Sequence, residues 1–184
     1  MSLQDPEQIL AAFQTSAHDG TPQPVALPIL EPIGAFSRFK GQEHRVGIAG
    51  NSQPQAIRIE TWDTGQAGEL AFKRGITLYP CQVLPVLQGL LNGMTMAAEM
   101  EATDPEHHPP LPCRLVEAIG PGGMVHLALE RYRERLQVKA SGPLGDWLTL
   151  DLPSAHPVGA LIAQAYEQRF SVSLVSTPDE GIPF

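Results

Sequence analysis

Residues 76–91 have the sequence ITLYPCQVLPVLQGLL and residues 148–162 have the sequence LTLDLPSAHPVGALI, and these two stretches decide the fold. Each begins as an alternating strand, meets a proline, and reaches a Pro-Val pair before it continues as an apolar helix. Proline ends a strand and is tolerated only in the first turn of a helix. Both stretches therefore predict a strand-to-helix corner, and their match indicates an internal duplication. The alternative is that two unrelated corners of this kind look alike.

Alternation between apolar and polar residues predicts the strands that precede each corner. In the first half, the expected strands cover residues 46–48, 56–62 and 69–79, and a helix follows over 81–100. In the second half, they cover residues 114–119, 124–132, 135–140 and 147–152, with a helix over 154–169. The predicted fold class is α+β, with two similar units that each contain an antiparallel sheet of about four strands followed by a helix. One such unit is too small to cover its own sheet, so we expect the units to pack through their helices.

Proline and glycine mark the chain around and between these units. We expect a flexible N-terminal arm over residues 1–34, a first unit over 35–102, a linker over 103–112, a second unit over 113–170 and a C-terminal tail over 171–184.

The net charge of -8 conceals an uneven distribution. All 12 lysines and arginines lie in the segment from Arg38 to Arg169. The arm, the linker and the tail contain aspartate and glutamate but no lysine or arginine. Residues 35–98 carry a net charge of +2 and residues 113–175 a net charge of 0, so the ordered blocks are neutral to slightly basic. Because the local charge sets the field that a polyanion meets, the negative total does not exclude a nucleic-acid partner.

The chain carries no sign of secretion or membrane insertion. Asp5 and Glu7 stand where a secretory signal needs positive charge, and the apolar stretch over 83–96 is too short to span a bilayer. Two distant cysteines, Cys81 and Cys113, do not form a disulfide framework. We expect a cytoplasmic protein of a bacterium, a bacteriophage or a mobile element.

No pattern of residues indicates catalysis or a cofactor. The sequence lacks GxSxG, GxxxxGK and HExxH motifs. The adjacent pair His107 and His108 has no third ligand at a useful spacing, so a linker is favoured over a metal site. We therefore expect neither enzyme activity nor a bound cofactor or metal.

The segment 73–78, KRGITL, lies before a proline and a helix, and it resembles the last strand of the positive-cofactor-four family of coactivators and its bacterial relatives. The duplicated strand-rich unit also resembles the Whirly proteins, although their lysine-rich motif is absent here. Both families bind single-stranded DNA on the sheet surface. The resemblance implies a Whirly-like pseudo-dimer whose DNA contacts are assigned by position on the strands rather than by motif.

The end of the chain, TPDEGIPF over residues 177–184, resembles the acidic tip of bacterial single-stranded DNA-binding proteins. In that family the tip docks on replication, repair and recombination proteins. Phe184 offers a ring and a free carboxylate on one residue, which an apolar pocket and a cation can hold together. Pro183 reduces the flexibility that is lost on docking. The predicted partner-binding tip consists of Asp179, Glu180, Ile182, Pro183 and Phe184.

Binding of single strands without sequence preference needs cations along the backbone and flat side chains for stacking. Outward strand positions repeatedly carry such residues. The candidate DNA contacts are Arg38, Lys40, Arg58, Trp62, Lys73, Arg74, Tyr79, Arg131, Arg133, Arg135, Lys139 and Trp147. The alternative for any one of them is a partly buried ring or a solvated cation.

Together these features predict a protein that protects single-stranded DNA and recruits processing proteins through its tip. A homodimer is compatible with the sequence. Two alternatives stay open: a coactivator-like regulator that acts on promoter DNA, and an adaptor protein whose tip is active but which has no affinity for DNA.

Overall fold

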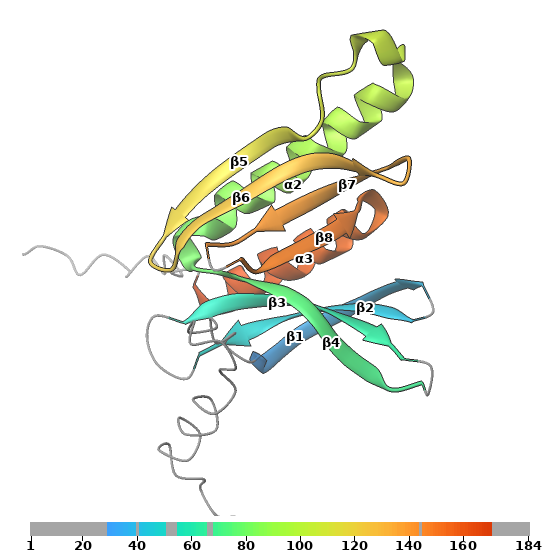
Figure 1. The fold of residues 1–184 in the computed structure, drawn as a ribbon. Coiled ribbons are helices and arrows are strands. Elements are labelled where there is room, and N and C mark those ends of the chain that lie inside the picture. The colour runs from blue at the N-terminus through green and yellow to red at the C-terminus, as the bar shows by residue number, and fades with distance from the viewer. Residues whose placement is uncertain (1–28, 40, 51–54, 66–67, 144, 171–184) are drawn as a thin grey trace, which may run out of the picture.

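The computed structural model describes residues 29–39, 41–50, 55–65, 68–143 and 145–170 (Figure 1). Within them, two four-stranded antiparallel sheets are each followed by one α-helix, which confirms the predicted α+β fold of two similar units. The first unit consists of β1 (Ile29–Phe39), β2 (Gln42–Ala49), β3 (Ala56–Thr64), β4 (Leu70–Leu78) and α2 (Pro80–Ala102). The second consists of β5 (Cys113–Gly120), β6 (Gly123–Tyr132), β7 (Arg135–Ser141), β8 (Trp147–Asp151) and α3 (Leu152–Arg169). A short 3-10 helix, η1 (Pro105–His107), lies between the units.

Strand β1 begins at Ile29, earlier than the predicted start of order at residue 35. It contains Pro32, which lies in the segment predicted to be a flexible arm. Strand β1 is an edge strand that pairs only with β2, and its register shifts around this proline. An edge strand accepts proline because one of its sides needs no ladder donor, so the proline content of this segment did not exclude a strand.

The two units exchange their helices. Helix α2 follows the first sheet but packs on β5 and β6 of the second, and α3 follows the second sheet but packs on β1 and β2 of the first (Figure 1). The helices also pack against each other, as expected from the sequence. Each sheet thus depends on a helix from the other unit to cover its apolar face.

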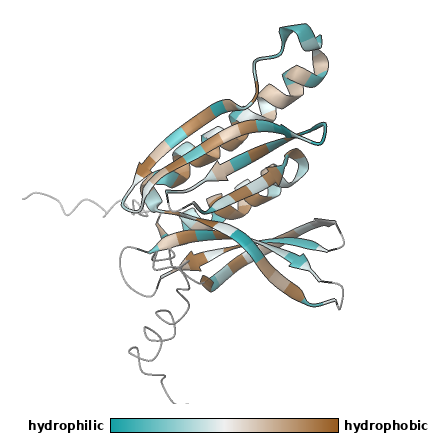
Figure 2. Ribbon diagram, in the orientation of Figure 1, coloured by the Kyte–Doolittle hydropathy of each residue, from teal (hydrophilic) through white to brown (hydrophobic). Residues whose placement is uncertain are grey.

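One continuous core results from this exchange. Hydrophobic and hydrophilic residues alternate along β6 and β7 (Figure 2). The apolar positions Val125, Leu127, Leu129 and Val138 are buried in the core. Ile59 of β3, Leu90 of α2 and Leu127 of β6 belong to the same cluster and are each at most 3% exposed. Burial of an aliphatic side chain of this kind contributes about 1.5–3 kcal/mol, so the shared core ties the units together.

Gln82 fixes the start of α2 to the second sheet. Its Oε1 accepts a hydrogen bond from the Tyr79 backbone N–H at 3.0 Å, which caps the helix. Its Nε2 donates to the carbonyl oxygens of Ala118 at 3.0 Å and Gly123 at 2.9 Å. All hydrogen-bonding atoms of this buried amide therefore have partners, as a polar group in a core requires.

None of the helices within the described residues has the length and apolar character needed to cross a membrane.

Glycines in α2 allow the helix to lie close to the second sheet. A Cβ placed on Gly89 would stand 2.6 Å from Val116 Cγ1, and one on Gly93 would stand 2.8 Å from Leu115 Cδ1. Gly159 of α3 is different, because a Cβ there would meet Leu90 Cδ1 at an ordinary 3.7 Å.

We expect Gly89→Ala to lower the free energy of unfolding by about 1–3 kcal/mol, because the stiff Val116 side chain has to move. The matched control Gly159→Ala should raise it by up to about 1 kcal/mol, because alanine has the higher helix propensity and finds space here. Urea denaturation of both variants measures these changes. Stabilisation by Gly89→Ala would show that α2 is not pressed against β5.

Candidate functional site

A cleft of about 750 Å³ lies between one end of the first sheet and the outer face of the second. Four basic and two acidic side chains contribute to it, together with two aromatic rings. Its lining consists of Gln42, Arg74, Glu130, Tyr132, Arg133, Arg135, Leu136, Gln137, Lys139, Trp147, Thr149 and Asp151.

The second sheet supplies most of the lining through simple strand alternation. Val138, Leu148 and Leu150 point into the core and are at most 3% exposed. Their neighbours along β7 and β8 consequently point outward. Lys139 pairs with Thr149, and Gln137 pairs with Asp151, so these four side chains form two adjacent rows of one face. Gln137 also donates to Glu130 Oε1 on β6 at 2.6 Å.

Trp147 occupies the part of the cleft where the two units meet. Its side chain is 39% exposed. The guanidinium carbon of Arg74, from β4 of the first unit, lies 4.3 Å from the ring centroid, and Lys139 Nζ lies 5.5 Å from it. Such cation–π contacts hold the ring and place positive charge around it. Arg74 Nε is buried and has no hydrogen-bond partner among the described residues.

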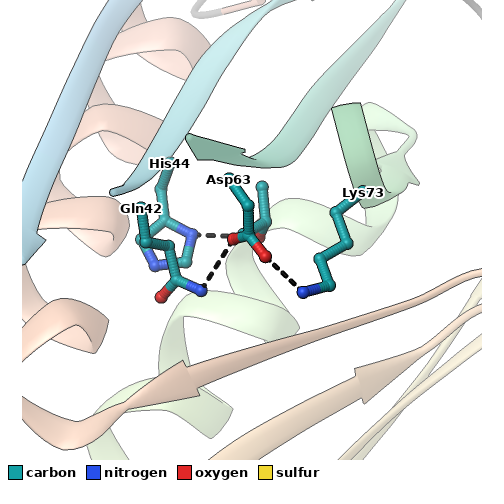
Figure 3. Close-up of polar contacts among 5 residues, drawn as sticks. Gln42, His44, Asp63 and Lys73 are labelled. Carbon is teal, nitrogen blue, oxygen red and sulfur yellow. Dashed lines mark hydrogen bonds and ion pairs between the residues drawn. The ribbon is translucent and has the colours of Figure 1, made fainter. Parts of the chain in front are cut away.

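A group of polar side chains from the first sheet stands behind Arg74. Cross-strand pairing aligns His44, Thr61 and Arg74 in one row across β2, β3 and β4. His44 Nδ1 lies 3.1 Å from Thr61 Oγ1 (Figure 3). The row fixes the strand position from which Arg74 extends toward the second unit.

Asp63 organises the neighbouring polar group (Figure 3). Its carboxylate accepts a hydrogen bond from Gln42 Nε2 at 3.2 Å and forms an ion pair with Lys73. Lys73 stands at a bulge, where the pairing of β3 with β4 shifts by one residue. Burial raises the pKa of Asp63, but the hydrogen bonds from Lys73 and Gln42 outweigh it and keep the pKa below its ordinary value.

The structure brings five of the predicted contacts together in the cleft: Arg74, Arg133, Arg135, Lys139 and Trp147. Arg131 is exposed on β6 and lines a neighbouring hollow of about 430 Å³, which Arg135 also lines. Arg38 belongs to β1, but its side chain lies outside the described part of the structure, as does the whole of Lys40.

Arg58 requires a correction, because it does not reach the surface. It is 2% exposed, its Nε lies 3.5 Å from Glu60 Oε1, and its Nη1 donates to Thr77 Oγ1 at 3.1 Å. Gly75 makes this possible, since a Cβ there would stand 2.8 Å from Arg58 Nη2. Burial lowers the pKa of this guanidinium, and the nearby Glu60 carboxylate opposes that shift. Alternation alone had assigned Arg58 to an open face.

The first unit's aromatic candidates also lie outside the cleft lining. Tyr79 precedes α2, and its ring lies against Gly122 in the β5–β6 turn, at the other end of β6 from the cleft. Trp62 is half-buried, and its Nε1 donates to Glu60 Oε2 at 2.9 Å. Phe72 packs edge-on against the Trp62 ring at 5.8 Å. Lys73 is exposed, but its ammonium group forms an ion pair with Asp63.

Polar members of the lining that are absent from the predicted contacts include Gln42, Gln137, Thr149 and Asp151. Gln137, Thr149 and Asp151 were recognisable, because they alternate with predicted core leucines and valines. Gln42 was not, because the first strand pair had no clear pattern before Val46.

No protein-family model matches this chain, and no curated protein matches its sequence.

His44 should make the stability of the fold depend on pH. Burial lowers the pKa of its imidazole below the ordinary value of 6.5; Asp151 opposes this shift and Arg74 adds to it. As the pH falls through 6.5, His44 becomes protonated in the unfolded chain but stays neutral in the folded chain. The contribution of His44 to the free energy of unfolding is thus complete above 6.5 and decreases as the pH falls toward the lower folded-state pKa.

We expect His44→Gln to flatten the decrease in unfolding free energy between about pH 7 and pH 5, because the titrating group is removed. The exposed His156→Gln serves as the matched control and should leave the slope unchanged. Urea titrations across this pH range measure both slopes. Equal slopes in the wild type and in His44→Gln would contradict the assignment.

Proposed function

We propose that this protein binds single-stranded DNA, largely without sequence preference, in the cleft between its two units. The observation that carries the proposal is Trp147, a partly exposed ring whose centroid lies 4.3 Å from Arg74 of one unit and 5.5 Å from Lys139 of the other. Proteins that hold single strands combine such aromatic platforms with a cationic path for the backbone.

The cations of the cleft supply that path. Arg74, Arg133, Arg135 and Lys139 form no ion pair within the described residues, so they can meet phosphates without first breaking an ion pair. Arg133 also lies 5.3 Å from the exposed Tyr132 ring, which adds a second flat surface. Each phosphate contact releases counterions, and affinity should therefore fall as the salt concentration rises.

The dimensions of the cleft favour an unpaired strand over a duplex. A volume of about 750 Å³ matches pockets that hold a small molecule, which corresponds to one or two nucleotides. The Trp147 ring needs a base whose face is free, and the bases of a duplex already stack on one another.

The C-terminal tip completes the proposed function. Residues 177–184 lie outside the described part of the structure, and this part of the proposal rests on the sequence. Asp179 and Glu180 would steer the tip toward a basic rim on a replication, repair or recombination protein, and Phe184 would fill an apolar pocket there.

We expect Trp147→Ala to weaken binding to oligo-dT by about 5- to 150-fold, since a stacked base contributes on the order of 1–3 kcal/mol. The control Trp62→Ala should cost about 2 kcal/mol of stability but leave the affinity within about twofold, because its ring packs within the first sheet. Fluorescence anisotropy over a salt series, with a duplex of equal length for comparison, measures the affinities.

The outcome also separates the alternatives. An adaptor without DNA affinity would not bind oligo-dT at any salt concentration. A coactivator-like regulator would prefer melted promoter sequences to oligo-dT in footprinting. Equal effects of the two tryptophan variants on affinity would remove Trp147 as the stacking platform.

Deletion of residues 182–184 should abolish docking of partner proteins and leave oligo-dT affinity unchanged, because it removes the apolar end of the tip and keeps the acids Asp179 and Glu180. Pull-down of a processing protein and an oligo-dT titration on the same preparation measure the two effects. A large loss of DNA affinity on this deletion would contradict the separation of the two roles.

A further inference from the structure

The internal duplication allows the two units to be compared position by position. Residues 76–86 align with residues 148–158 without a gap, which places Gly75 opposite Trp147 and Thr77 opposite Thr149. In the ladders, Thr77 pairs with Arg58 and Thr149 pairs with Lys139. Arg58 and Lys139 therefore occupy equivalent positions, as do Gly75 and Trp147.

At these equivalent positions the outer face of the first sheet is covered by protein atoms and is not accessible to a ligand. Arg58 lies buried over Gly75 and forms an ion pair with Glu60. The neighbouring Gly47 is covered by β1, since a Cβ there would stand 2.4 Å from Ile29 Cγ2 and 2.6 Å from the Glu31 carbonyl oxygen. A tryptophan in place of Gly75 would collide with the guanidinium that fills this space.

The second unit is open at the same place. Trp147 stands where the first unit has Gly75 and is 39% exposed. Lys139 stands where the first unit has a buried arginine, and its Nζ lies beside that ring. The cleft extends over both side chains.

The pairing of cations with acids also differs between the two sheets. On β2, β3 and β4, Arg45 pairs with Glu43 at 2.5 Å, and Lys73 pairs with Asp63. On β6, β7 and the turn between them, Arg131, Arg133, Arg135 and Lys139 form no ion pair within the described residues. Arg45, Arg58 and Lys73 of the first sheet are therefore paired with acids of that sheet, and Arg74 is the exception among its described side chains. In the second unit Arg114 pairs with Glu117 on β5, but the four cations of β6, β7 and their turn are available.

We propose that the two units, although alike in fold, are unequal in function. This inference rests on the proposed binding of single-stranded DNA. The second sheet holds the strand, with Arg74 as the single cleft-lining cation from the first unit, and the equivalent face of the first sheet is a structural support. Withdrawal of Arg58 toward a phosphate would leave the buried Glu60 carboxylate without its cationic partner, so the closed face does not serve as a second site. One chain therefore binds no more than one segment of single-stranded DNA.

Two double variants that remove the same charge test this asymmetry. Arg135→Ala with Lys139→Ala affects the second sheet, and Arg45→Ala with Lys73→Ala affects the first. Both are made in the full-length chain and titrated with short fluorescein-labelled oligo-dT. We expect the first pair to lose about tenfold or more in affinity at about 0.1 M salt, and to reduce the slope of log K against log salt by about 1.4 for two lost phosphate contacts. The second pair should stay within about twofold of the wild type.

Titration of the wild type at protein concentrations far above Kd gives the number of strands per chain, which we expect to be one at most. Equal losses in the two double variants, or two oligonucleotides bound per chain, would overturn the asymmetry and leave the proposed function standing. Absence of any oligo-dT binding by the wild type would overturn the proposed function and this inference with it. Urea denaturation of each variant shows that a loss of affinity does not come from unfolding.

Discussion

The packing of each helix on the sheet of the other unit is the contact on which the rest of the structure depends. Helix α2 lies close enough to β5 and β6 that Gly89 and Gly93 have no space for a side chain, and Gln82 bonds to the backbone of both strands. The apolar face of each sheet is covered by the helix of the other unit, so neither sheet would be covered if the other unit were absent. The duplicated chain therefore folds as one body with a shared core rather than as two linked domains.

This exchange also determines where the cleft lies. With both helices placed against the inner faces, the edge strands β4 and β8 are brought together, and Arg74 reaches the Trp147 ring across that junction. Cross-strand pairing of His44 with Thr61 and of Thr61 with Arg74 fixes the backbone position of this arginine. A cationic and aromatic surface thus forms between units that are separated by a linker in the sequence.

The difference between the two outer faces follows from a few small residues. Gly47 and Gly75 allow β1 and Arg58 to fill the outer face of the first sheet, whereas Ala128 and Trp147 stand at the equivalent positions of the second. A net charge of -8 is compatible with the cationic cleft because eight of the 20 acids belong, in the sequence, to the arm, the linker and the tail rather than to the strands that line it.

The sequence by itself determined β2 to β8, the helices α2 and α3 and their order, because period-two alternation and the strand-proline-helix corners are local signals that need no tertiary contact. It did not reveal β1, because the prolines before residue 35 favoured a flexible arm. It also identified Arg135, Lys139 and Trp147 as outward residues, since β7 and β8 alternate regularly. Only the tertiary structure decided that Arg58 is buried, that Tyr79 packs on the β5–β6 turn and that Arg74 lies against Trp147. Alternation tells which face of a strand a side chain occupies, but burial of that face depends on which other segments cover it, and those segments are distant in the chain.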